Sequence, residues 1–353
     1  MLLSTIGNRT LTQPLAVSMG EPAGIAPDVT LLSWAHEHAS LPPFYVVGDP
    51  ALYRARSKSI GLDITVKEIE SPRQALSLHG HALAVMPVDG QVRAQPGKPN
   101  AEDASLVLQA LQLSINACKS GEASGLVTGP IHKKSLYQTG FNYQGHTDFL
   151  AAVFQTEGTP INEVMMLCTE AVDPPLRVVP VTIHNAVADV SQILSTEKII
   201  ATGMTLNDAL QTQFGITTPN IAVAALNPHA GESGAMGDEE ATVIKPAIQA
   251  LQASGINASG PYPADTLFHA ENRHNFDAVL CMYHDQALIP LKTLDFYGGI
   301  NVTLGLPIIR TSPDHGTAFE IASTGKAKPD SMIAALKLAG RLAQGQKAKK
   351  PNG

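Results

Sequence analysis

The chain has 353 residues and a mass of 37.2 kDa, which is long enough for one large domain or two ordinary ones. Hydrophobic residues make up 44% of it and charged residues 16%, a composition that excludes an intrinsically disordered protein. The formal net charge of −7, without any basic block, argues against nucleic acid as a partner.

In the first third of the chain, strand-like runs alternate with helix-like ones. The strand-like runs are continuous apolar stretches, which is typical of strands buried on both faces of a parallel sheet. They cover residues 14–19, 44–49, 81–88 and 125–130. Helical patterns follow them, beginning at Asp28, after residue 49 and at 101–117. This alternation of strands and helices predicts a mainly parallel sheet covered by helices on both faces.

The middle of the chain changes pattern. The apolar runs 163–169 and 176–184 are separated by EAVDPP, a proline-rich turn, and predict an antiparallel pair of strands. Further on, the sequence predicts helices at 196–213, near 239–253 and at 329–345, and strands at 220–227 and 278–283. The expected fold class is α/β, with a mixed sheet in two lobes and a cleft between them.

Membrane insertion and secretion are not expected. No apolar run reaches the roughly 18 residues that a membrane helix needs, and the apolar segment in MLLSTIGNRTLTQ is too short for a signal peptide. Cys118, Cys168 and Cys281 are widely spaced and lie mostly inside apolar runs. Reduced core thiols in a cytoplasmic protein are the simplest interpretation.

Three histidines occupy equivalent places, where an apolar strand gives way to a polar loop. His184 ends the run LRVVPVTIH, His229 follows NIAVAALN by one residue, and His284 ends AVLCMYHD. Three imidazoles can bind one divalent metal and leave positions open for substrate oxygens. The alternative is that each is an isolated, hydrogen-bonded histidine, and the spacing alone does not decide between the two.

Several residues suit an anion. In GHTDFL, His146 and Thr147 open a helix, with Thr147 expected as its N-cap, and the backbone N–H groups there could hold a phosphate. The alternative is an ordinary helix cap. Lys292, Asn301 and Arg310 add two cations and an amide suited to phosphate or carboxylate, although each alone is more often a surface group.

Two glycine-containing loops follow strands. The first, SMGEPAGIAP (18–27), has neither the GxGxxG pattern nor a Lys-Ser/Thr pair, so it is not read as a dinucleotide fingerprint. The second, TGPIHKK (128–134), carries His132 and Lys133 at a strand end, where a site role and a solvated loop remain equally open.

Long motifs in the chain resemble the 4-hydroxythreonine-4-phosphate dehydrogenase family of vitamin B6 biosynthesis, in the expected order from about Pro14 to Leu338. They are GEPAGIAP, VVGDP, GKPNAED, VTGPIHK, GHTDFLA, NPHAGE, MYHDQALIPLK and GGINVTLGLPIIRTSPDHGTAFEIA. The resemblance implies an isocitrate/isopropylmalate dehydrogenase-like fold. It also implies a homodimer with the active site at the subunit interface. The expected lobes are residues 1–130 with 305–353 on the cofactor side, and 131–304 for metal, substrate and dimerisation.

The resemblance also implies roles for individual residues. The metal ligands fall on His184, His229 and His284, binding zinc, magnesium or cobalt. The substrate-binding residues fall on His146, Thr147, Lys292, Asn301 and Arg310. The loop similar to the one that holds NAD or NADP in the wider superfamily comprises Asp314, His315, Gly316, Thr317, Ala318, Phe319 and Glu320.

The implied reaction is the NAD(P)-dependent oxidation and decarboxylation of 4-phosphooxy-L-threonine to 3-amino-2-oxopropyl phosphate, assisted by a metal. Asp285 and Lys292 are both candidates for the general base. The family commonly has glycine where Ala26 and Ala287 stand, and AGKG where this chain has ASTGKA (322–327), which bears on the choice between NAD and NADP.

Other functions remain open. Relatives in the same family act on threonate or erythronate 4-phosphates. A metal-dependent hydrolase would also use three histidines and a carboxylate, but it gives no account of the DHGTAFEI segment. A phosphate acyltransferase of the same fold would lack the histidines, and an inactive binding protein fits the full set of site residues poorly.

Overall fold

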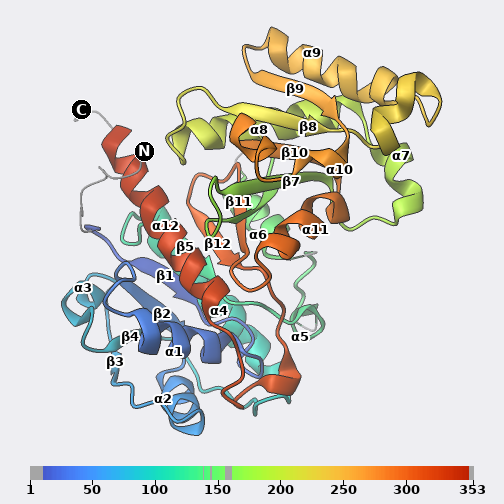
Figure 1. The fold of residues 1–353 in the computed structure, drawn as a ribbon. Coiled ribbons are helices and arrows are strands. Elements are labelled where there is room, and N and C mark those ends of the chain that lie inside the picture. Colours follow the sequence, from blue (N-terminus) through green and yellow to red (C-terminus); the bar gives the residue numbers. More distant parts are fainter. Residues whose placement is uncertain (1–10, 138, 144, 156–160, 350–353) are drawn as a thin grey trace. The chain divides into compact units, whose positions relative to one another are not determined.

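The computed structural model describes residues 11–137, 139–143, 145–155 and 161–349, and the chain folds into two compact units (Figure 1). One unit comprises residues 1–149 and 308–353, and the other comprises 150–307. These divisions differ from the expected ones at 130/131 and 304/305. The segment between helices α4 (Ala104–Lys119) and α6 (His146–Phe154) goes with the first unit because α5 (Lys133–Tyr137) packs against α4.

The first unit contains six strands in the order β3-β4-β2-β1-β5-β12, all parallel to their neighbours. Their bounds are Leu15–Ser18 (β1), Phe44–Gly48 (β2), Val66–Glu68 (β3), Leu83–Pro87 (β4), Leu126–Thr128 (β5) and Arg310–Pro313 (β12). The strands β1, β2 and β5 are buried along their whole length. The predicted parallel sheet of the first third is therefore confirmed.

Helices surround this sheet. Besides α4 and α5, they are Ala26–Glu37 (α1), Pro50–Ser59 (α2), Gln74–Leu78 (α3) and Asp330–Lys349 (α12), with short 3₁₀ turns at Ala101–Asp103 (η1) and Phe319–Ile321 (η6). Helix α4 packs on β1, β2 and β5, and α12 packs on β12, β5 and β1. His146 and Thr147 lie in α6, after β5, and residues 314–320 follow β12, whereas Arg310 is the first residue of β12.

The second unit has a mixed sheet in the order β11-β6-β7-β10-β8-β9. Its strands are Val164–Thr169 (β6), Leu176–Thr182 (β7), Asn220–Ala224 (β8), Asn257–Tyr262 (β9), Ala278–Tyr283 (β10) and Ile300–Leu304 (β11). β6 is antiparallel to both β7 and β11, which confirms the predicted antiparallel pair. The remaining neighbours, β7-β10, β10-β8 and β8-β9, are parallel.

The helices of the second unit are α7 (Val190–Ile193), α8 (Thr196–Thr212), α9 (Lys245–Ala253), α10 (Ala264–Leu267) and α11 (His284–Leu294). Its shorter helical turns are η2 (Val187–Asp189), η3 (Pro228–Gly234), η4 (Glu240–Ile244, a π-helix) and η5 (Asn272–Asn275). Lys292 lies in the last turn of α11. The described helices include none that is long and apolar enough to span a membrane.

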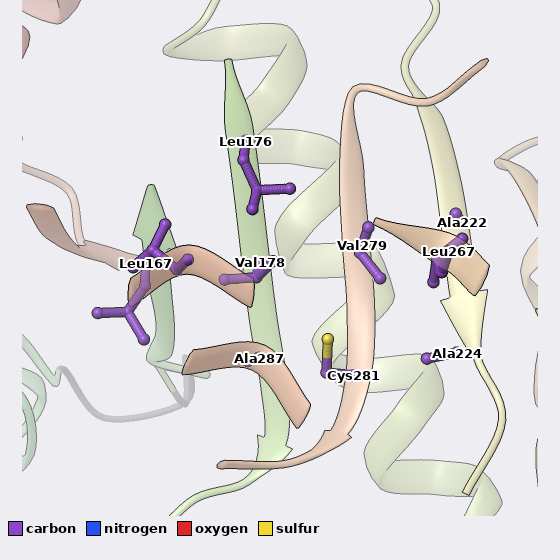
Figure 2. Close-up of a cluster of buried hydrophobic side chains, with 10 residues drawn as sticks. Leu167, Leu176, Val178, Ala222, Ala224, Leu267, Val279, Cys281 and Ala287 are labelled. Carbon is purple, nitrogen blue, oxygen red and sulfur yellow. The ribbon is translucent and has the colours of Figure 1, made fainter. Parts of the chain in front are cut away.

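A hydrophobic core supports the parallel strands of the second unit, and Figure 2 shows its side chains along β7, β10 and β8. It consists of Leu167, Leu176, Val178, Ala222, Ala224, Leu267, Val279, Cys281, Ala287 and Leu291. Full burial of a leucine or valine side chain contributes about 1.5–3 kcal/mol. The free thiols of Cys168 and Cys281 are buried, and Cys118 is half-buried. The core fixes the strand ends from which the candidate metal residues project.

Candidate functional site

The carboxyl ends of β7, β10 and β8 lie at one edge of the second unit's sheet, because the three strands are parallel neighbours. Tyr283 at the end of β10 pairs with Thr182 at the end of β7. His284 comes one residue after that pair, and His184 comes two residues after it. His229 lies in η3, beyond the end of β8. The topology thus brings all three predicted metal residues to the same edge of one sheet.

Two of these histidines face one another. The ring centroids of His184 and His284 are 6.2 Å apart, with an angle of 40° between the ring planes. Both rings line a cavity of about 140 Å³, which has room for several water molecules. The other lining residues are Thr182, Ile183, Asn185, Val187, Val190, Tyr283 and Asp285. A pair of imidazoles on such a cavity suits a divalent cation with open coordination positions.

Asp285 fixes the orientation of His284. The Nδ1 of His284 lies 2.8 Å from Oδ1 of Asp285, so Nδ1–H donates to the carboxylate when the imidazole is neutral. This leaves Nε2 of His284 as the nitrogen with a lone pair for a metal. Histidine ligands commonly donate their second N–H to a carboxylate, which orients the ring and makes it a better ligand.

His229 lies on an unusual segment of backbone. Residues 229–233 all have positive φ, with values of 52°, 54°, 75°, 41° and 58°, so they form a left-handed turn in which only Gly231 is a glycine. Within the described part of the chain, no three His, Cys, Asp or Glu side chains lie close enough together to hold a metal ion. His184 and His284 are brought together, whereas the participation of His229 stays a prediction.

A buried carboxylate holds the loop that carries His229. Oε1 of Glu240 accepts hydrogen bonds from the backbone N–H groups of Leu226 and Asn227, at 2.9 and 2.7 Å. Its Oε2 accepts from the side-chain amide of Asn227 at 3.0 Å. A Cβ added at Gly231 would lie 2.5 Å from the same Oε2. Glu240 therefore determines both the path of this loop and the need for glycine in it.

Side-chain hydrogen bonds also connect the strand ends to one another. Gln286 is buried; its amide donates to the carbonyl of Ala225 at 2.6 Å and its oxygen accepts from Met282 N–H at 2.7 Å. The hydroxyl of Thr182 donates to the carbonyl of Met282 at 2.8 Å. Sequence reasoning missed Glu240 and Gln286. The only signal for Gln286 was its place beside His284 and Asp285 at a helix start.

The two predicted substrate-binding residues of the second unit, Lys292 and Asn301, lie on α11 and β11. The ammonium of Lys292 is 5.4 Å from the ring centroid of Phe296, and this aromatic contact gives the lysine a defined place. Asn301 is half-buried and pairs with Leu167 across β11 and β6.

In the first unit, Arg310 is a buried cation at the start of β12. Its side chain is 3% exposed, and its guanidinium donates to Oγ1 of Thr128 at 2.7 Å. Burial lowers the pKa of Arg310 to about 10. A guanidinium is suited to bind a phosphate or a carboxylate through two parallel hydrogen bonds, so this position suits an anion.

His146 adds a second group suited to an anion. Its side chain as a whole is half-buried, but Nε2 is closed off from solvent and has no hydrogen-bond partner among the described residues. Burial, and then the charge of Arg310, lower the pKa of His146 well below 6.5. The expectation that Thr147 caps the helix is corrected, because α6 begins at His146 and Thr147 lies within its first turn.

The predicted cofactor segment follows β12 and is held by contacts from the loops after β1 and β5 and from helix α12. The carbonyl of Thr317 accepts a hydrogen bond from the N–H of Ile25 at 2.9 Å. The ring of Phe319 meets His132 edge-on, with centroids 5.1 Å apart. Asp314 N–H donates to Ser331 Oγ at 2.9 Å. The rest of the segment, His315, Gly316, Ala318 and Glu320, is partly or fully exposed, which suits binding of a ligand.

Comparisons with known proteins show the family to which the chain belongs. Residues 40–339 match the family described as PdxA, pyridoxal phosphate biosynthetic protein. A protein of Erythrobacter litoralis named 4-hydroxythreonine-4-phosphate dehydrogenase is 48% identical over 334 residues, covering 94% of this chain and 97% of that protein. One of the same name from Bradyrhizobium diazoefficiens is 46% identical over 340 residues, covering 94% and 97%.

A solved structure supports the fold as well. The 4-hydroxythreonine-4-phosphate dehydrogenase of Klebsiella pneumoniae is similar with a TM-score of 0.82 and 36% identity, covering 94% of this chain and 99% of that one. This likeness confirms the expected α/β fold class. The family match covers most of the chain, and the relatives match it over nearly their whole length. The chain therefore belongs to the PdxA family of pyridoxal phosphate biosynthetic proteins.

Proposed function

We propose that this protein is an NAD(P)-dependent dehydrogenase that converts 4-phosphooxy-L-threonine to 3-amino-2-oxopropyl phosphate and CO₂. The observation that carries the proposal is near-full-length identity of 46–48% to relatives named 4-hydroxythreonine-4-phosphate dehydrogenase. The buried Arg310 and the paired His184 and His284 are the features of this chain that suit such a substrate.

The reaction has two balanced steps. In the first, the C3 hydroxyl of the substrate gives its proton to a base and C3 gives a hydride to NAD(P)⁺, which produces a β-keto acid. In the second, the bond between the carboxylate carbon and C2 breaks, CO₂ leaves, and a proton adds to C2. Both steps build negative charge on the C3 oxygen, so groups that stabilise that charge accelerate both.

The proposal gives each predicted site residue one chemical role. His146, Thr147 and Arg310 in the first unit bind the phosphate, and residues 314–320 bind the cofactor. His184, His229 and His284 in the second unit bind a divalent metal, with Lys292 and Asn301 on the substrate. When bound, the metal supplies Lewis-acid stabilisation of negative charge on oxygen, and the nicotinamide supplies the hydride acceptor.

We assign the proton transfer to Lys292 in preference to Asp285. The carboxylate of Asp285 already accepts from Nδ1 of His284, and it serves there to orient a metal ligand. Lys292 lies two helical turns further along α11, in the last turn of the helix. A Lys292→Met variant should keep metal and cofactor affinity and lose turnover.

In this proposal, the metal site is completed when two copies of the chain form a dimer. Four side chains on α11 and just after it are exposed although they are apolar: Ile289, Leu294, Phe296 and Tyr297. Apolar groups gathered in this way favour contact with another protein surface. We infer that a second copy of the chain covers them. We also infer that dimerisation completes a metal site for which the described residues of one chain align two histidines, His184 and His284.

A substrate comparison tests the proposal. Steady-state kcat/KM is measured from NADH and NADPH formation with 4-phosphooxy-L-threonine and with 4-phosphoerythronate, each with zinc, magnesium or cobalt. The proposal expects a clear preference for the amino-acid phosphate. Faster turnover of 4-phosphoerythronate would assign the protein to the sugar-acid branch of the family, and phosphate release without reduced cofactor would indicate a hydrolase.

A further inference from the structure

An ion pair between Asp28 on α1 and Arg56 on α2 is buried in the first unit. The Asp28 side chain is 0% exposed and the Arg56 side chain is 2% exposed, and Nη1 of Arg56 contacts Oδ2 of Asp28 directly. Burial raises the pKa of Asp28, against the opposing effect of the Arg56 charge. Hydrophobic residues of similar volume are often at least as stabilising as a buried pair, so a role beyond stability has to be considered.

The remaining hydrogen-bonding atoms of the pair hold two different loops. Arg56 donates from Nη1 to the carbonyl of Gly24 at 3.0 Å and from Nη2 to the carbonyl of Pro22 at 2.9 Å. Oδ1 of Asp28 accepts the N–H of Ser323 at 2.7 Å. Arg56 therefore fixes the turn after β1, and Asp28 fixes the end of the segment after β12.

The same two loops also contact one another. The N–H of Ile25 donates to the carbonyl of Thr317 at 2.9 Å. A Cβ added at Gly24 would lie 2.6 Å from that carbonyl oxygen, so only glycine permits this approach. The predicted cofactor residues 314–320 are thus positioned by the glycine-containing turn 20–25, which lacks a dinucleotide fingerprint of its own.

The segment held in this way carries backbone strain. Ala318 has φ 42° and Ser323 has φ 62°, and these residues flank η6. Left-handed conformations of residues other than glycine persist only where surrounding contacts hold them. At Ser323 the contact is the hydrogen bond to Asp28. Without the ion pair, the backbone of this segment would relax toward ordinary φ values.

We propose that Asp28 and Arg56 are positioning residues for the cofactor, which hold residues 314–323 in the conformation that binds NAD(P). The inference rests on the proposed function, because it requires that these residues bind the nicotinamide cofactor. It predicts that damage to the pair weakens cofactor binding selectively, since Arg310 and His146 lie outside the hydrogen bonds of the pair.

The test uses the full chain with Arg56→Lys, which keeps the charge and loses the planar fork that reaches three acceptors. The matched control is Arg54→Lys on the same helix, where the wild-type arginine is half-exposed and bonds Glu68 at 2.7 Å. NAD affinity and inorganic phosphate affinity are measured by calorimetry. KM for NAD and kcat at saturating NAD are measured with substrate.

Arg56→Lys should weaken NAD binding about tenfold or more, because small displacements of a binding loop are costly. Phosphate affinity and saturating kcat should stay within about twofold of wild type, and the control should change neither affinity. Unchanged NAD affinity, or parallel loss of NAD and phosphate affinity, would overturn the inference. A wild-type protein that binds no NAD would overturn the proposed function itself.

Gly24→Ala gives a second test that leaves the ion pair intact and covers the case in which Arg56→Lys does not fold. Its new Cβ would push against the carbonyl of Thr317, so NAD affinity should fall in the same direction while phosphate affinity is kept. Wild-type NAD affinity in Gly24→Ala contradicts the claimed coupling between the two loops.

Discussion

His184 and His284 face one another with ring centroids 6.2 Å apart, each just past the end of one of two paired parallel strands. Neither residue is near the other in sequence, so the pairing of β7 with β10 creates the relationship. Two imidazoles held in this way suit a divalent cation, and the pairing of the two strands sets their separation.

The first prediction concerns the carboxylate that orients His284. Asp285→Asn should lower cobalt(II) affinity by about 10- to 100-fold, because the carboxylate partner of a histidine ligand is lost. NAD affinity should not change. Cobalt titration followed by visible absorption measures the effect, with Asp208→Asn, an exposed position on α8, as control. Equal cobalt affinity in both variants would remove Asp285 from the metal site.

The second prediction concerns the buried guanidinium. Arg310→Lys keeps a positive charge but loses the fork that reaches Thr128. We expect the lysine to lose one hydrogen bond to the phosphate. Loss of a hydrogen bond between charged groups costs about 1.5–3 kcal/mol, so phosphate affinity should fall by about 10- to 100-fold. Calorimetry with inorganic phosphate measures it, and Arg341→Lys on the exposed face of α12 is the control. Unchanged phosphate affinity would mean that Arg310 serves packing alone.

The third prediction follows from the lowered pKa of His146. The folded-state pKa lies below the usual 6.5, so the unfolded chain takes up the proton more readily. Without ligand, the contribution of this group to stability is complete above about pH 6.5 and is lost as the pH falls toward the folded-state pKa.

Phosphate should reverse this shift. An anion beside His146 stabilises the imidazolium, so the pKa of His146 should rise and phosphate binding should take up a proton when measured just below pH 6.5. NMR titration of the imidazole with and without phosphate measures both values, with His146→Gln to assign the resonance. A pKa that phosphate leaves unchanged would place the anion elsewhere.

The fourth prediction compares two glycines of the loop that carries His229. Both Gly231 and Gly234 have positive φ. An added Cβ at Gly234 would meet nothing within 4 Å, whereas at Gly231 it would meet other atoms, the nearest being Oε2 of Glu240 at 2.5 Å. Gly234→Ala should cost about 1 kcal/mol of unfolding free energy from conformation alone, whereas Gly231→Ala should cost roughly 1–3 kcal/mol more from the clash. Urea unfolding of the two variants measures the difference. Equal costs would contradict the role given to Glu240.

Much of the fold follows from the sequence because buried parallel strands are continuous apolar runs. The strands that escaped prediction lack this signal. β12 is Arg-Thr-Ser-Pro and β9 contains Gly260 and Pro261, while β3 has three residues and β11 (INVTL) alternates apolar and polar residues. These strands form because neighbouring strands offer backbone partners. Such tertiary effects override local propensity.

The candidate site was predictable in kind but not in arrangement. The position of His184 and His284 at strand ends is visible in the sequence. That the two rings lie together follows from the parallel pairing of β7 with β10, which the sequence does not show. The left-handed turn at His229 depends on Glu240, eleven residues further along the chain, which local sequence does not reveal. The Asp28–Arg56 pair likewise joins residues from two helices and becomes visible only in the folded unit.

The most direct test of the central claim uses 4-phosphooxy-L-threonine labelled with ¹³C at the carboxylate. NADH absorbance and labelled CO₂ are followed together in the metal-loaded enzyme, with His184→Ala as comparison. The account predicts one CO₂ for each NADH and loss of both in the variant, with its fold retained by circular dichroism. NADH without CO₂, or wild-type rates in His184→Ala after chelation, would contradict it.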